Sequence, residues 1–271
     1  MTAATTTANP GSPSGVPQRT VPPLGSLNPT LLLLEARRLL RNRRTVIFSV
    51  VLPVAFYLLF GTGKDYSLQS AGPHGNWAAA IMISMALYGA MLSTTAAGAM
   101  VSTERSQGWS RQLRLTPLTP TAYIAVKVLV AMLLGAVSIA VTYAAGALTQ
   151  AQLDGGLWIQ TALIAWVGSL VFAAFGVFMG YLLPTDNVMQ IIGPGLALLA
   201  FLGGLFTPLD QMGHTFQTIA KFTPMYGVSQ LTHAPIAGQV PGWSVVLNVL
   251  VWLAIFAGGA AWRFRRDTAR V

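Results

Sequence analysis

The feature that most constrains this chain is a series of long apolar segments, each with at most one Asp, Glu, Lys or Arg. A helix needs about 20 mostly apolar residues to cross the hydrocarbon core of a bilayer. Backbone polar groups must pair with one another in that core, so segments of this length cross it as helices. The sequence therefore predicts an all-α integral membrane protein with six spans, at residues 45–62, 77–101, 121–149, 157–183, 188–204 and 243–262.

The composition excludes the ordinary soluble classes. Charged residues make up 8% of the chain and hydrophobic residues 54%, whereas a soluble domain carries about 25% charged residues. The chain has no cysteine, which excludes disulfide scaffolds, thiolate metal sites and thiol nucleophiles.

The basic residues are distributed along the chain in a way that predicts its orientation. Lys and Arg number 16 against 7 Asp and Glu, for a net charge of +9. With both termini in the cytoplasm, all basic residues except Lys64 and Lys221 fall on the inner side of the membrane, as the positive-inside rule requires. Lys127, near the start of the third span, is expected to snorkel toward that side. Basic residues that all lie at one membrane face do not form a binding groove for nucleic acid. We expect a multi-pass protein of the inner (plasma) membrane.

The segments outside the spans have distinct compositions. Residues 1–28 are rich in Thr, Ala, Gly, Pro and Ser, and predict a disordered cytoplasmic tail. Residues 29–44 combine leucines with arginines, which favours an amphipathic helix in the inner membrane interface over a solvated basic flank. The six-span domain then covers 45–263, followed by a basic cytoplasmic tail at 264–271. Prolines interrupt the outer segment 205–241, which predicts a re-entrant pair of short helices packed against protein.

The predicted inner loop, residues 102–119, has the features of a docking element. It is short, charged and placed between two spans, and a glycine within it permits close approach of another backbone. The alternative is a solvated connector that carries ordinary topology charges. The candidate coupling residues are Glu104, Arg105, Gly108, Trp109, Arg111, Leu113, Arg114, Thr116 and Pro117.

An ordered set of motifs resembles the permeases of the ATP-binding-cassette (ABC) type-2 exporter family. Glu104-Arg105, Gly108, Leu113, Thr116-Pro117 and a lysine ten residues later resemble the family's inner loop. Gly203-Gly204-Leu205-Phe206-Thr207-Pro208 and Thr223-Pro224-Met225-Tyr226 resemble its glycine–proline and proline–tyrosine signatures before the last span. The resemblance covers about residues 29–265 and is strongest to the daunorubicin-resistance-type drug permeases.

The resemblance implies an assembly. A second permease copy, as a homodimer, and two copies of a separate ABC ATPase subunit would complete a drug-efflux translocase of the kind that confers antibiotic resistance. ATP and Mg would bind to the ATPase subunit, since this chain lacks a G-x-x-x-x-G-K-[ST] phosphate loop. No cofactor, metal or catalytic residue is expected in the permease chain.

The resemblance also implies which spans line the substrate path. Adaptable apolar side chains on the second and fifth spans would suit a hydrophobic small molecule, although the same side chains could simply pack between helices. The candidate path residues are Met82, Met85, Tyr88, Met91, Thr95, Met189, Leu196, Leu199 and Phe201. The candidate outer-gate residues are Gly203, Gly204, Phe206, Pro208, Pro224 and Tyr226.

Other functions remain open at this point. Export of a lipid or glycan precursor would use the same mechanism. A membrane enzyme acting on lipid would need clustered Asp, Glu or His at one membrane face. A passive pore or structural subunit would have no ATPase partner.

Overall fold

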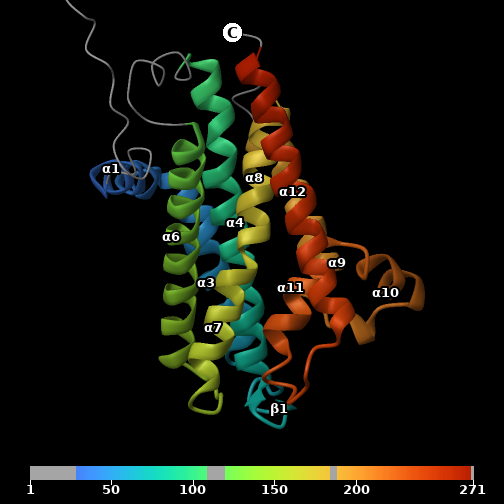
Figure 1. The fold of residues 1–271 in the computed structure, drawn as a ribbon. Helices are drawn as coiled ribbons and strands as arrows, with labels where there is room; N and C mark the ends of the chain where they lie inside the picture. Colours follow the sequence, from blue (N-terminus) through green and yellow to red (C-terminus); the bar gives the residue numbers. More distant parts are fainter. Residues whose placement is uncertain (1–28, 109–119, 184–187, 270–271) are drawn as a thin grey trace, which may run out of the picture.

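The structure, a computed structural model, describes residues 29–108, 120–183 and 188–269 and is mostly helical (Figure 1). The predicted tail at 1–28 and most of the inner loop lie outside these ranges. The helices are α1 (Pro29–Leu40), α2 (Arg43–Val46), η2 (Ile47–Val51), α3 (Leu52–Gly61), α4 (Trp77–Ser106), α6 (Pro120–Ala147), α7 (Leu157–Gly168), α8 (Leu170–Leu182), α9 (Val188–Leu202), η3 (Leu209–Gln211), α10 (His214–Ala220), α11 (Pro224–His233) and α12 (Trp243–Ala269).

Among the described residues, four helical segments are long and apolar enough to cross a membrane, which supports an all-α membrane protein. They are Trp77–Ser106, Ala122–Ala147, Leu157–Leu182 and Trp243–Arg266, the third combining α7 and α8. The predicted first and fifth spans are shorter apolar helices, Ile47–Gly61 and Gln190–Leu202. Six spans therefore remain a prediction.

α4 forms the centre of the bundle, and small residues let its neighbours approach closely. In its most apolar stretch, 89% of the residues are buried. Where it meets α8, a Cβ added to Gly176 would lie 2.3 Å from the Thr95 carbonyl oxygen, and one added to Gly98 would lie 2.7 Å from the Val177 nitrogen. Close backbone approach at small residues is the usual way in which helices pack within membranes.

Two helices run further than the sequence analysis expected. α4 continues through Ser106, so residues 102–106 are helical and the connection to α6 begins at Gln107. α12 continues to Ala269, so residues 264–269 are helical as well. Neither extension contains a proline or glycine, and a basic residue lies in the last turn of each helix, Arg105 and Arg266, where it interacts favourably with the helix dipole.

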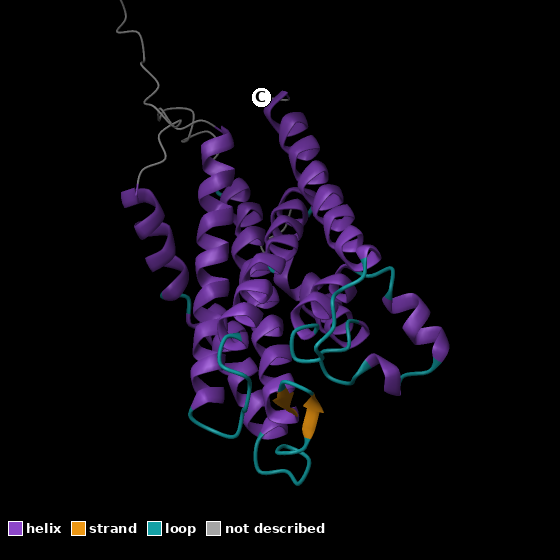
Figure 2. Ribbon diagram, turned by 60° about the horizontal axis from the view of Figure 1, so that its bottom comes forward, coloured by secondary structure: helices purple, strands orange, loops and turns teal. Residues whose placement is uncertain are grey.

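A small hairpin lies at the end of the bundle opposite the carboxyl terminus, and the sequence analysis did not predict it. β1 (Ser70–Gly72) pairs antiparallel with β2 (Gly75–Asn76) (Figure 2). Asn76 then caps α4 by accepting a hydrogen bond from the Ala79 amide at 2.9 Å. The hairpin thus fixes the start of the central helix.

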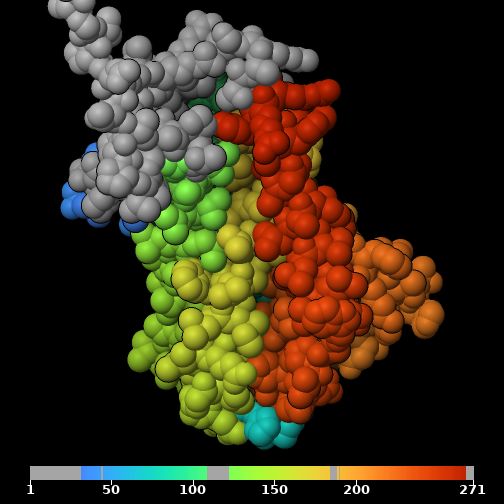
Figure 3. Space-filling view, viewed as in Figure 1, coloured from blue at the N-terminus to red at the C-terminus, as the bar shows by residue number. Residues whose placement is uncertain are grey.

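The segment 205–241, which is predicted to face outward, folds into short helices that occupy different places. α11 packs against α4, α7, α9 and α12, whereas the segment around α10 projects from the side of the molecule (Figure 3). Whether the pair is re-entrant remains a prediction.

Candidate functional site: a buried charge cluster beside residues 107–119

Five side chains from three helices meet beside the connection between α4 and α6. We call Glu35, Arg38, Glu104, Tyr123 and Lys127 the charge cluster. The Lys127 ammonium donates to both carboxylates, to Glu104 Oε1 and, at 2.8 Å, to Glu35 Oε2. Arg38 donates to Glu104 Oε1 at 3.2 Å, and the Tyr123 hydroxyl donates to Glu104 Oε2.

The cluster is buried and electrically balanced. Glu104 is 2% exposed and Lys127 4% exposed, and the side chain of Glu35 is 11% exposed. Only Arg38, whose side chain is 45% exposed, reaches the surface. Two carboxylates face two cations, and both Glu104 oxygens accept hydrogen bonds, which meets the condition under which buried ions are tolerated.

Helical spacing brings these residues together. Glu35 and Arg38 lie three residues apart on α1, and Tyr123 and Lys127 lie four apart on α6, so each pair shares one helix face. α1 lies beside α6 (Figure 1) and packs on it through Ala36 and Leu39. Its exposed Leu33 and Leu34 support the predicted position in the membrane interface.

Arg105, the neighbour of Glu104, contacts a different helix. Its guanidinium donates to the carbonyl oxygens of Gly180 and Tyr181, at 3.3 and 3.0 Å, and lies 5.3 Å from the centre of the Tyr181 ring. It therefore caps the last turn of α8, where carbonyls lack partners within the helix.

The charge cluster corrects two expectations. Lys127 does not snorkel to the inner face, because two buried carboxylates hold its ammonium inside the bundle. Glu104 and Arg105 lie on α4 and not in a loop, and their side chains bind other helices of the same chain. The role of these two residues in coupling remains a prediction. Of the other candidate coupling residues, Gly108 has a φ of 71°, while Trp109, Arg111, Leu113, Arg114, Thr116 and Pro117 lie outside the described residues.

The predicted path residues of α4 lie in the core of the single chain. Met82, Met85, Tyr88, Met91 and Thr95 are all at most 6% exposed. They do not line an open path within one chain, and their role in transport remains a prediction.

The predicted path residues of α9 are more varied. Leu196 is buried, Leu199 is half-buried and Phe201 is 41% exposed, whereas the side chain of Met189 is not described. Only part of this set could face a substrate or a partner chain.

The two predicted outer-gate motifs form helix boundaries. Gly204, at a φ of 77°, ends α9, and the amide of the next residue bonds to the Ala200 carbonyl at 3.0 Å, the pattern of a Schellman cap. At the other motif Thr223 caps α11 by accepting from the Tyr226 amide at 3.4 Å, with Pro224 in the first turn.

An aromatic contact joins a predicted path residue on α4 to a predicted gate residue. The rings of Tyr88 and Phe206 lie 5.2 Å apart in an edge-to-face arrangement. Gly203 also packs closely, since a Cβ there would lie 2.2 Å from the Met225 side chain. Pro208 stands at the start of η3. The gate motifs thus hold α9 and α11 together and against α4.

Sequence reasoning missed four members of the charge cluster as a site: Glu35, Arg38, Tyr123 and Lys127. A signal for them was present, because an ionisable residue inside an otherwise apolar span is a candidate functional residue by default. Lys127 is such a residue, and its i−4 neighbour Tyr123 is the one polar aromatic on the same helix face.

Comparison with known proteins identifies the family of the chain. Residues 29–233 match the family described as ABC-2 type transporter. The chain is also 28% identical over 224 residues to "Putative transport permease YvfS" of Bacillus subtilis (strain 168), covering 82% of this chain and 90% of that protein. The family match begins at α1, includes the whole charge cluster and ends at α11. This chain therefore belongs to the ABC-2 type transporter family, as a transport permease of the membrane.

Proposed function

We propose that this chain is the permease subunit of an ATP-driven exporter that moves hydrophobic or amphipathic small molecules, such as drugs or antibiotics, out of a bacterial cell. Two copies of the chain would assemble with two ATPase subunits, which would bind ATP and Mg. The observation that carries the proposal is the charge cluster, which ties α1 to both helices that flank residues 107–119.

The cluster suits a transmitting role. Removing one partner of a buried ion pair costs about 3–5 kcal/mol, so α1, α4 and α6 resist separation at this point. A push on residues 107–119 from a docked ATPase would then move the three helices together. The cap that Arg105 makes on α8 would extend the movement to a fourth helix.

The test is ATP-dependent transport by the permease reconstituted with its cognate ATPase subunit, with daunorubicin as the hydrophobic probe. Arg38→Ala removes the most exposed member of the cluster, and Arg37→Ala, on the exposed side of the same helix, is the matched control. We expect Arg38→Ala to keep the ATPase subunit bound while lowering transport, and Arg37→Ala to behave as the wild type.

Two outcomes would contradict the proposal. If the wild-type complex moves no probe when ATP is added, the chain is not a drug exporter. If the complex transports but Arg38→Ala and Arg37→Ala are equally active, the cluster does not transmit ATPase movement.

A further inference from the structure

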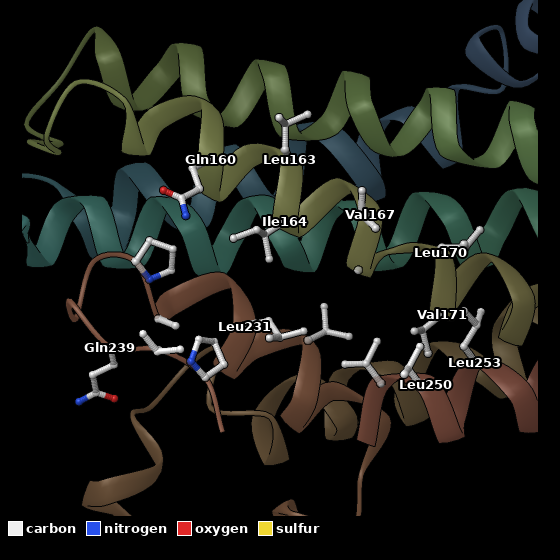
Figure 4. A pocket seen from close by; sticks show the side chains of 17 residues that line it. Gln160, Leu163, Ile164, Val167, Leu170, Val171, Leu231, Gln239, Leu250 and Leu253 are labelled. Atoms are coloured by element: carbon white, nitrogen blue, oxygen red, sulfur yellow. The ribbon is translucent and has the colours of Figure 1, made fainter. Parts of the chain in front are cut away.

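A second site lies on the side of the bundle where α7 and α8 meet α11 and α12 (Figure 4). It is a cavity of about 690 Å³, within the range of about 300–1,000 Å³ that small-molecule pockets occupy. Its wall includes Ile164 and Val171 from one side and Leu231 and Leu253 from the other. None of the residues predicted to line the transport path contributes to it.

The cavity lies among membrane-spanning helices and opens to their surroundings. The segments that carry most of its wall, Leu157–Leu182 and Trp243–Arg266, are long and apolar enough to cross the bilayer. Leu163, Val167 and Leu250, at its rim, are 50–61% exposed. The open side therefore faces the hydrocarbon chains of the membrane, which are the most abundant apolar groups at this depth.

The wall has a polar end. Gln160 and Gln239 lie on opposite sides of the cavity, both toward the end nearest the start of α7 and away from Leu250 and Leu253 (Figure 4). Among the described residues, no side chain bonds to either carboxamide, and no charged residue lines the cavity. The site thus presents a long apolar wall with uncharged hydrogen-bonding groups at one end.

We propose that this cavity binds one acyl chain of a bilayer phospholipid, with the ester region of the lipid at the end of the cavity that Gln160 and Gln239 line. An apolar cavity does not hold water well, and an empty one would lose dispersion contacts along its whole wall. An acyl chain supplies those contacts, and its ester carbonyl can accept from the carboxamides. The proposal is independent of the exporter proposal, because it concerns the chain in a bilayer without ATP or cargo.

The test uses the full-length chain in nanodiscs of phosphatidylcholine that carries a diazirine in the middle of one acyl chain. After illumination, mass spectrometry locates the labelled peptides. Ile164→Trp fills the cavity. Ile159→Trp, at a 69% exposed position on the same helix and outside the cavity, is the matched control, and both variants must elute as monodisperse protein.

We expect label on the cavity residues of α7, α8 and α12, a several-fold loss in Ile164→Trp and no change in Ile159→Trp. Gln160→Leu should also lower labelling, whereas Gln230→Leu, outside the cavity, should not. Equal labelling of the exposed Leu198 on α9, or no loss in Ile164→Trp, would overturn the proposal. Cross-links between two protein copies at cavity residues in place of lipid would overturn it too, because a second chain would then fill the site.

Discussion

At the scale of single residues, this chain places a few polar side chains where an apolar bundle tolerates them only when they are paired. Glu104 and Lys127 are almost fully buried, and each has more than one partner. The energetic consequence is asymmetric, because a satisfied cluster adds little net stability but a broken one leaves an unpaired buried charge.

Lys127→Met should therefore destabilise the protein strongly, by about 3–5 kcal/mol, since two buried carboxylates lose their shared cation. Lys221→Met, at an exposed position, is the control and should have little effect. The measurement is the apparent melting temperature of the detergent-solubilised protein. Equal melting temperatures for the two variants would mean that the cluster is not formed in the folded protein.

His233 forms another polar contact between helices. Its Nδ1 lies 2.9 Å from the Ser229 carbonyl oxygen and its Nε2 lies 3.0 Å from Ser84 Oγ, so it links α11 to α4. His233→Phe should lower thermal stability, because a buried polar group left without a partner costs about 1–3 kcal/mol. His214→Phe, at an exposed position, should not. A melting temperature unchanged by His233→Phe would argue against this link.

At the scale of elements, the arrangement depends on how closely helices approach. The α4–α8 contact has no room for a side chain at Gly176, whereas nothing lies within 4 Å of a Cβ added at Gly258 on α12. Both glycines lie within helices, so replacing either one raises the intrinsic helix propensity by a similar amount.

Gly176→Leu should therefore force α4 and α8 apart and reduce the yield of folded protein, while Gly258→Leu should be tolerated. The readout is the amount of monodisperse protein after size-exclusion chromatography in detergent. Loss of folded protein in both variants would mean that the open face of α12 is covered by something else, such as a second copy.

At the scale of the whole molecule, the remaining question is orientation. Because the chain has no cysteine, a single introduced cysteine reports unambiguously on which side of the membrane its residue lies. Gln69 and Gln107 are both exposed and lie toward opposite ends of α4. We expect Gln69→Cys, and not Gln107→Cys, to react with an impermeant maleimide in intact cells or sealed spheroplasts. The reverse pattern would mean that the chain has the opposite orientation in the membrane. Labelling of both variants only after permeabilisation would contradict the predicted outer placement of the hairpin.

The sequence by itself determined the class of protein, most of the apolar helical segments and the family motifs. Runs of apolar residues without charge can only be helices in a bilayer, and short signals such as Thr223-Pro224 and Gly203-Gly204 act locally as caps. These features do not depend on which helices are neighbours, so they can be read along the chain.

Only the tertiary structure decided what the polar residues do. The sequence placed Glu104 and Arg105 in a loop and Lys127 at the membrane face, whereas packing of α1, α4 and α6 puts Glu104 and Lys127 in one buried cluster and packing of α4 on α8 turns Arg105 into a cap. The α4 path candidates likewise became core residues, because α4 is surrounded on all sides. A buried charge is tolerated only when it is paired. The partners of Glu104 and Lys127 lie far apart from them in the sequence, so only the packing of the helices shows which residues are paired.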